Sequence, residues 1–344
     1  MELALYCPIH GYYEKQKDNV GRSGDFITSV STGALFGQLL AFQFAGWLEE
    51  LHLSPATRHP SLCLIEAGAH DGKLAKDILT WLQLNRPKLF DQLEYCILEP
   101  SARRQDWQRE TLKQFASHVR WFTSFENLSP ATRHPSLAGI IFSNELLDAF
   151  PVHRFGWDGR NKKWFEWGVA IEGEKFVWAR VPENLQPPTF NLHPSGLESV
   201  LPDGYTIETS PAAESWWREA AGFLVRGKLV TIDYGFIGDE QLSPARTNGT
   251  LRAYFRHHVS DDLLANVGEQ DLTAHVNFSA IQKAGEETGL KTEFFGTQSK
   301  FLTEILKTQF AIPNSQFAIS PRQFQTLTHP AHLGRAFRVL VQAR

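Results

Sequence analysis

The sequence predicts an α/β protein built on a seven-stranded, mostly parallel sheet. Three observations support this fold class. Short β-rich runs alternate with helical stretches, the run at 64–79 reads as a strand, a glycine turn and a helix, and an acid also ends the next predicted strand. In open sheets of this kind, ligands bind beyond the carboxyl ends of the strands.

Seven segments read as strands, at 62–68, 94–100, 119–125, 138–144, 227–235, 291–297 and 337–343. Between the first two, Leu74, Ile78 and Leu82 recur at helical spacing, and Pro87 follows to end the helix. The right-handed crossover rule then makes the first two strands parallel neighbours.

The alternation of strands and helices breaks at 155–226. Two hairpins are expected there, with turns at "WDGRNKK" and "IEGEK", followed by a proline-rich loop. The segment starts at the carboxyl end of the fourth strand, so it is either a substrate lid or an excursion that only covers the sheet.

One string, "SPATRHPSL", occurs at 54–62 and again at 129–137, each time before an apolar strand. Two copies without a fixed period do not make a repeat architecture. We interpret the string as a turn-forming loop duplicated at two strand entrances.

Composition describes a globular protein without a bulk charge signal. The 344 residues are 42% hydrophobic and carry a formal net charge of -4, which gives no general attraction to nucleic acid or to anionic membranes. The three cysteines lack metal-ligand spacing, and no apolar run approaches the roughly 20 residues that span a bilayer. We therefore expect no metal, no membrane insertion and a cytoplasmic location.

The first turn offers acids for a cationic nucleoside. Glu66 ends the first strand, Gly68 and Gly72 bracket the turn, and Glu99 ends the second strand, where it can accept both hydroxyls of a ribose. Asp71 adds negative charge, and a Walker lysine-serine pair is missing, so phosphates fit poorly. A ligand with a ribose, an ammonium and a carboxylate fits better, which favours S-adenosyl-L-methionine.

A set of motifs resembles the MidA family of S-adenosylmethionine-dependent methyltransferases. The motifs are "GRSGDFITS", "IEAGAHDGKLAKDIL", "LEPSARRQDWQ", "SNELLDAFPVHRF", "IDYGF", "GTLRAYFRHH" and "GEQDLTAHVNFSAI", and the match covers about residues 5 to 300. The chain departs from better-known members at His70, where they have glycine. The resemblance implies a Rossmann-like class I methyltransferase core with the cofactor at the tips of the first two strands.

The family includes a mitochondrial complex I assembly factor that methylates a protein arginine, and many bacterial relatives. The resemblance therefore implies a protein substrate, and we expect a bacterial protein that is a monomer or a homodimer. We divide the chain into a cofactor-covering region at 1–53, a first core part at 54–154, the inserted lid at 155–226 and the remaining core with substrate-side helices at 227–344.

Residues after the fourth strand are the best candidates for catalysis. Asn144 ends that strand and is also expected to contact the cofactor, while Glu145 and Asp148 would share a face if a helical turn follows. Two carboxylates can hold a guanidinium by charge-assisted hydrogen bonds. The alternative is that they cap a helix or pair with an arginine elsewhere in the chain.

Two further segments supply candidates. Gly24, Asp25 and Thr28 lie in "GRSGDFITS", a loop that either closes over the cofactor or caps a helix, and the family motif favours the cofactor. His275 is a secondary catalytic candidate, since a single histidine is more often structural than a base.

Two other functions remain open from the residues alone. A nicotinamide-dependent oxidoreductase would share the ribose-binding acid, but it needs a tight pyrophosphate turn that Ala69, His70 and Asp71 do not obviously form. An assembly chaperone would keep the fold and residual cofactor binding while it holds a partner protein.

Overall fold

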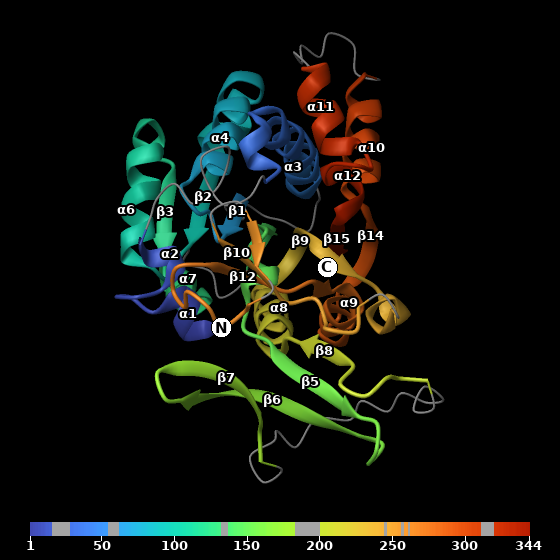
Figure 1. The fold of residues 1–344 in the computed structure, drawn as a ribbon. Coiled ribbons are helices and arrows are strands. Elements are labelled where there is room, and N and C mark those ends of the chain that lie inside the picture. Colours follow the sequence, from blue (N-terminus) through green and yellow to red (C-terminus); the bar gives the residue numbers. More distant parts are fainter. Residues whose placement is uncertain are drawn as a thin grey trace.

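The computed structural model describes residues 1–15, 28–53, 62–131, 137–182, 200–243, 246–255, 258–260, 262–310 and 320–344. A central sheet with the strand order β14-β15-β9-β4-β1-β2-β3 runs through the molecule (Figure 1). Strands β1 to β4 and β9 pair in parallel, while β15 runs antiparallel between β9 and β14. The α/β fold class and all seven predicted strands are confirmed, with ends that differ by a few residues.

The sheet strands lie where the apolar runs predict them. Their bounds are β1 Leu62–Ala67, β2 Leu93–Leu98, β3 Val119–Phe122, β4 Leu137–Asn144, β9 Leu224–Phe236, β14 Lys291–Thr297 and β15 Phe337–Ala343. A short strand, β13 (Val276–Asn277), pairs with the end of β9. Every residue of β1 is buried, as expected for a parallel strand covered on both faces.

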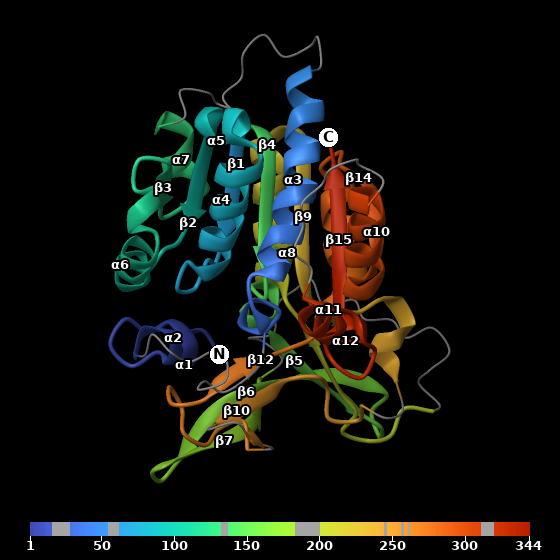
Figure 2. The ribbon, with the colours of Figure 1, turned by 90° about the horizontal axis from the view of Figure 1, so that it is seen from above.

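Helices cover both faces of this sheet, and alternate side chains of each strand meet a different layer. Leu64 packs in the cluster of α3, α4 and α10, whereas Ile65 packs in the cluster of α7, α8 and α9 (Figures 1 and 2). The helix bounds are α3 Leu35–Leu53, α4 Lys73–Asn85, α5 Pro87–Gln92, α6 Ala102–Thr111, α7 Phe125–Ala131, α8 Pro211–Phe223, α9 Phe278–Glu287, α10 Gln298–Phe310, α11 Pro321–Thr328 and α12 Leu333–Ala336.

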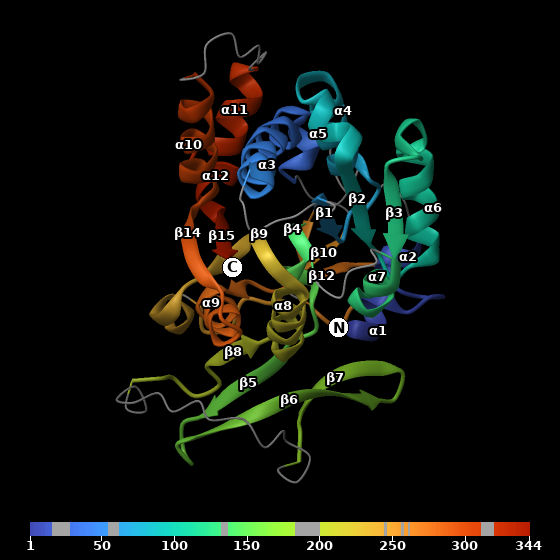
Figure 3. The ribbon, with the colours of Figure 1, turned by 180° about the vertical axis from the view of Figure 1, so that it is seen from behind.

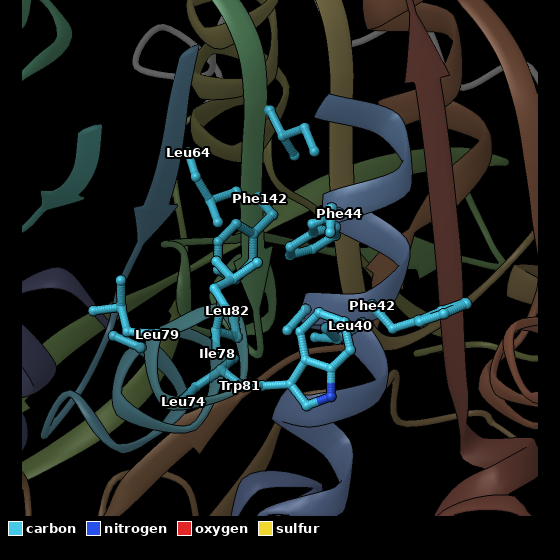
Figure 4. Close-up of a cluster of buried hydrophobic side chains, with 14 of the residues drawn as sticks. Leu40, Phe42, Phe44, Leu64, Leu74, Ile78, Leu79, Trp81, Leu82 and Phe142 are labelled. Carbon is cyan, nitrogen blue, oxygen red and sulfur yellow. The ribbon is translucent and has the colours of Figure 1, made fainter. Parts of the chain in front are cut away.

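The first of these clusters joins α3 and α4 to the sheet. Phe44 of α3 lies against Phe142 of β4, with ring centroids 4.9 Å apart, and Ile78 and Leu82 of α4 point toward them (Figure 4). This packing anchors the helix that follows the first turn. It therefore fixes the position of the turn itself.

A separate four-stranded antiparallel sheet has the order β7-β6-β5-β8 and holds both predicted hairpins. Its strands are β5 His153–Asp158, β6 Lys163–Glu172, β7 Lys175–Arg180 and β8 Thr206–Thr209. Figure 3 shows it beneath α8. Helix α8 falls inside the 155–226 segment, but it packs on the central sheet against α9, so the lid cannot include it. The proposed lid role of the antiparallel strands stays a prediction.

A third, three-stranded sheet was not predicted. Strands β10 (Arg252–Phe255), β11 (His258–Ser260) and β12 (Asp271–Thr273) form it, and helices α1 (Glu2–Tyr6) and α2 (Tyr12–Lys15) pack on it. In Figure 2 these elements lie at the same end of the central sheet as β5, β6 and β7.

The duplicated "SPATRHPSL" string lies largely outside the described residues, which omit 54–61 and 132–136. Its second copy begins within α7, and both copies end at the first residue of a strand.

Candidate active site at the carboxyl ends of the parallel strands

A cavity of about 1450 Å³ opens where β1, β2, β3 and β4 end. It exceeds the roughly 300–1,000 Å³ of a typical small-ligand site, so a cofactor leaves room for part of a second molecule. Six predicted site residues line it, namely Thr28, Glu66, Gly68, Glu99, Asn144 and Glu145. Gly72, Asp148 and His275 do not belong to its described lining, and Gly24 and Asp25 lie outside the described residues.

The first turn has an unusual backbone. Gly68 and Gly72 adopt φ values of 71° and 82°, and a Cβ atom on Gly68 would lie 2.7 Å from Leu146 Cδ1, so both positions favour glycine and a larger residue at 68 would displace Leu146. His70 also has a positive φ, 47°, which is a strained conformation for a residue with a side chain. The turn is therefore a ligand loop with a histidine at a position suited to glycine.

Asp71 precedes Gly72, the N-cap residue of α4. Its Oδ1 accepts a hydrogen bond from the Lys73 amide at 3.0 Å. Burial opposes ionisation, but hydrogen bonds from His70 and from this amide lower the pKa of Asp71 below its ordinary value. The ionised Asp71 therefore occupies part of the α4 N-terminus, which reduces its capacity for a ligand carboxylate.

Glu66 is buried at the end of β1 and accepts a hydrogen bond from the Tyr95 hydroxyl at 2.5 Å. Burial raises the pKa of Glu66 to about 8, although the Tyr95 hydrogen bond works in the other direction. The carboxyl is therefore largely protonated at neutral pH in the absence of a cation. An incoming ammonium group would stabilise its ionised form.

Glu99, at the tip of β2, is fully buried and has partners on both oxygens. Its Oε1 lies 3.0 Å from Arg104 Nη2 and accepts from the Ser101 amide at 3.0 Å, and its Oε2 accepts from Gln108 Nε2 at 3.2 Å. Burial raises the pKa of Glu99, while Arg104 lowers it. The sequence predicted Glu99 but not Arg104, although Arg104 stands only five residues later in the same motif.

Two polar atoms after β4 are left without partners. Asn144 Nδ2 donates to Glu145 Oε1 at 3.0 Å, but Asn144 Oδ1 and Glu145 Oε2 are buried and form no hydrogen bond within the described chain. Glu145 has a φ of 51°, and burial raises its pKa to about 8. Buried polar atoms nearly always have partners, so these two are available to a ligand.

Three more carboxylic acids lie close behind Glu145. Asp233 Oδ2 accepts the amides of Leu146 and Leu147 at 3.2 and 2.9 Å, which holds the turn after β4. Burial and the charges of Asp233 and Asp271 raise the pKa of Asp148 well above its ordinary value. Within the residues the structure describes, no Lys, Arg or His forms an ion pair with Glu145, Asp148 or Asp233. The group is therefore rich in acids and poor in compensating charge.

His275 lies elsewhere. It lines a water-sized cavity of about 20 Å³ together with Glu208 and Asn277, and burial lowers its pKa to about 4. His275 is not among the described residues that line the large cavity. Its catalytic role stays a prediction that the geometry does not support.

Residues that follow β3 also line the cavity, and the sequence did not predict them. Thr123, Ser124 and Phe125 line the cavity next to Phe150 and Trp216, and the Phe125 and Trp216 rings lie 5.9 Å apart. Rings at this separation contact each other, so a flat aromatic base can stack beside the pair but not between its members. Their common position at a strand end was the only signal in the sequence.

Comparison with known proteins decides the family. The family model described as "Putative S-adenosyl-L-methionine-dependent methyltransferase" matches residues 39–296. The chain belongs to this family. It is therefore an enzyme that uses S-adenosyl-L-methionine to transfer a methyl group, as the motifs predicted, and the nicotinamide alternative is excluded.

A solved structure of a protein from Burkholderia thailandensis supports S-adenosyl-L-methionine as the cofactor. That protein, a "likely methyl transferase" bound to S-adenosyl-homocysteine, is 32% identical, has a TM-score of 0.81 and matches over 100% of this chain and 86% of its own. The native structure of a protein from the same organism gives 30% identity and a TM-score of 0.78, over 100% of this chain and 85% of its own.

Curated relatives are more distant. The mitochondrial protein arginine methyltransferase NDUFAF7 homolog of Drosophila melanogaster is 26% identical over 99% of this chain and 79% of its own length. The Homo sapiens protein arginine methyltransferase NDUFAF7 is 25% identical over 83% of this chain, which spans 64% of the human protein.

Among the described residues, no group of three or more histidine, cysteine or acidic side chains has a geometry that could hold a metal ion. No described helix is both long and apolar enough to cross a membrane.

The residues at the site fit the cofactor. Glu99 can accept hydrogen bonds from ribose hydroxyls, Glu66 can attract an ammonium, and the unpartnered Asn144 Oδ1 offers a further acceptor on the same side of the cavity. Phe125 and Trp216 line the cavity, where the adenine ring could contact their side chains.

Proposed function

We propose that the chain methylates the guanidinium group of an arginine in a partner protein. The observation that carries this proposal is the unpartnered Glu145 Oε2 at the cavity, with Asp148, Asp233 and Asp271 close to it. In the described chain, no Lys, Arg or His forms an ion pair with Glu145, Asp148 or Asp233. A guanidinium supplies planar donors and a permanent positive charge. The names of the curated relatives agree with this acceptor.

The bound cofactor supplies an electrophilic methyl group on a sulfonium. The chain must orient one guanidinium nitrogen and remove the proton that this nitrogen loses when it gains the methyl group. Glu145 has the reach for both tasks, because its Oε2 is free to bind the acceptor and its pKa of about 8 makes its carboxylate basic enough to take a proton. Asp148 lies behind Glu145 and stabilises the positive charge of the acceptor.

Arginine, rather than lysine, is favoured by the names of the curated relatives and by the planar donors of its guanidinium. A guanidinium can donate hydrogen bonds to two carboxylates at once in a fixed plane, whereas an ammonium acts as a compact point charge. Entry of either side chain would replace the missing cation and draw the acids toward their ionised forms.

The test is to identify the amino acid that receives the methyl group. Purified protein, methyl-labelled S-adenosylmethionine and a lysate from cells that lack the gene are incubated, and the labelled proteins are hydrolysed to amino acids. We expect labelled methylarginine, which the Glu145→Gln variant does not produce. Label on another amino acid or on a small molecule would contradict the proposal, and cofactor binding without label in any protein would favour the chaperone alternative.

A further inference from the structure

The N-terminal segment Met1–Lys15 lines the cavity and bonds to two separate parts of the chain around it. The Tyr13 hydroxyl donates to Asp271 Oδ1 at 2.8 Å, on the acid-rich side, and the Ser101 hydroxyl donates to Glu14 Oε2 at 2.8 Å, on the side of Glu99. These two residues of α2 are adjacent in sequence. One short helix therefore connects the loop after β2 to the acids near β12.

Arg104 lies between two carboxylates and is bonded well to only one of them. Its Nη2 lies 3.0 Å from Glu99 Oε1, whereas its Nε lies 3.8 Å from Glu14 Oε1, too far for a hydrogen bond. This Nε is buried and has no hydrogen-bond partner in the described chain. The guanidinium also lies over the Tyr13 ring, 5.9 Å from its centroid. Arg104 would therefore gain a partner by moving toward Glu14.

A ribose at Glu99 needs the bonding capacity that Arg104 now uses. A carboxylate has about four acceptor positions, and Arg104, the Ser101 amide and Gln108 already take three on Glu99. Two ribose hydroxyls therefore require one donor to leave. The Ser101 amide is fixed by the backbone, and Gln108 is held by further bonds to the His70 carbonyl and to the Trp121 ring nitrogen.

We propose that Arg104 is a positioning residue that moves its ion pair from Glu99 to Glu14 when the cofactor ribose binds. The new pair holds α2 more firmly and with it the Tyr13 hydroxyl on Asp271. Cofactor binding thereby orders the N-terminal segment over the cavity before the acceptor enters. The ordering of the segment before the acceptor enters rests on the proposed function, since that function assigns the acids to the acceptor. The exchange of partners at Arg104 depends only on the cofactor.

Hydrogen exchange followed by mass spectrometry tests the exchange of partners. The full chain is measured with and without saturating S-adenosylhomocysteine, and peptides that cover residues 5–15 are compared. We expect the product to slow exchange there by about fivefold or more, the lower end of ordinary coupling between linked sites. No change in these peptides, at a concentration where the product is bound, would overturn the proposal.

Two variants locate the effect. Glu14→Gln keeps the shape of the side chain and removes the charge that Arg104 needs, so the product should bind without slowing exchange in residues 5–15. Glu269→Gln is the matched control, because it removes the ion pair that Glu269 forms with Lys15 on the same segment but does not touch Arg104. The control should keep the product-dependent slowing.

Arg104→Gln supplies a second route if Glu14→Gln does not fold. It should bind S-adenosylhomocysteine and show no slowing in these peptides. Slowing as large as in the unmodified chain, in either variant, would overturn the proposal. Since these measurements contain no acceptor, their outcome is independent of whether arginine is the residue that is methylated.

Discussion

Glu99 and Glu145 lie at the carboxyl ends of β2 and β4, the two strands that flank β1, and their surroundings differ. Glu99 follows β2 and has an arginine, an amide and a glutamine as partners. Glu145 follows β4, adopts a positive φ, and has one oxygen without a partner in the described chain. Both line the same cavity.

The difference shows how one cavity can serve two ligands. At Glu99 an arginine, an amide and a glutamine offset part of the cost of burial, although burial still raises the pKa of this carboxyl. At Glu145 the cost is not offset, and the carboxyl keeps its proton until a cation arrives. We propose that the first end binds the cofactor and that the second end binds a positively charged acceptor.

The largest expected effect is on methyl transfer. Glu145→Gln keeps the size of the side chain and removes its basicity, so the rate at saturating cofactor should fall by about 10²- to 10⁴-fold. In the unmodified protein kcat/KM for the acceptor should rise with pH through about 8, because this ratio reports the pKa of Glu145 before the guanidinium enters. Asp148→Asn should cause a smaller loss and keep this pH profile. A flat pH profile in the unmodified protein would remove Glu145 as the base.

The second effect concerns stability against pH. Burial raises the pKa of Glu145 to about 8 in the folded chain, from an ordinary value of 4.5, so its contribution to stability is complete below 4.5 and is lost as the pH rises through 8. The free energy of unfolding of the unmodified protein should therefore fall between pH 5 and pH 9. At about 1.4 kcal/mol per pKa unit, Glu145→Gln should make this fall smaller by about 2–4 kcal/mol. Denaturant unfolding at both pH values measures this difference. An equal fall in the free energy of unfolding of the unmodified chain and of Glu145→Gln would contradict the raised pKa of Glu145.

The third effect is on cofactor affinity. Glu99→Ala should weaken binding of S-adenosylhomocysteine by about 1.5–3 kcal/mol, the cost of a lost hydrogen bond to a charged group. The structure adds that Arg104 then lacks its partner, so the variant should also be less stable, which the sequence alone did not indicate. Glu99→Ala combined with Arg104→Gln is the control, since it should recover stability without recovering affinity. Calorimetry and thermal unfolding separate the two quantities.

The smallest effect is expected at His70. Replacement by glycine should stabilise the chain by about 0.5–1 kcal/mol, because glycine adopts the positive φ of this turn without strain. Ala69→Gly is a matched control one residue away, where φ is not positive and glycine should destabilise instead. A loss of stability in His70→Gly would show that contacts of the imidazole outweigh the strain.

The sequence predicted those parts of the site that follow long strands. Glu66, Glu99 and Asn144 each end a run of buried residues, and the order of such runs identifies the edge of the sheet where they meet. Their partners could not be predicted in this way. The choice between a free Glu99 and one paired with Arg104 depends on side-chain directions at the start of α6, which spacing along the chain does not specify.

The acids and the tyrosine near β12 were unpredictable for a different reason. Strand β12 has three residues, too few for a period of two to be recognised, and Asp271 meets Tyr13 across 258 positions of sequence. "DLTAHVNF" drew attention to His275, whereas the structure brings Asp271 of the same motif into the acid group. Only the three-dimensional path of the chain separates these two residues.

The division of roles between Glu99 and Glu145 is tested most directly by two quantities measured on the same preparations. These are the dissociation constant of S-adenosylhomocysteine and the rate of methylarginine formation at saturating cofactor, in Glu145→Gln and in Glu99→Gln. We predict that Glu145→Gln binds the product within about threefold of the unmodified chain, well under the tenfold that 1.4 kcal/mol represents, and loses transfer. Glu99→Gln should bind it more weakly and recover most of its transfer rate at saturation. Loss of affinity in both variants, or full transfer by a stably folded Glu145→Gln, would contradict the account.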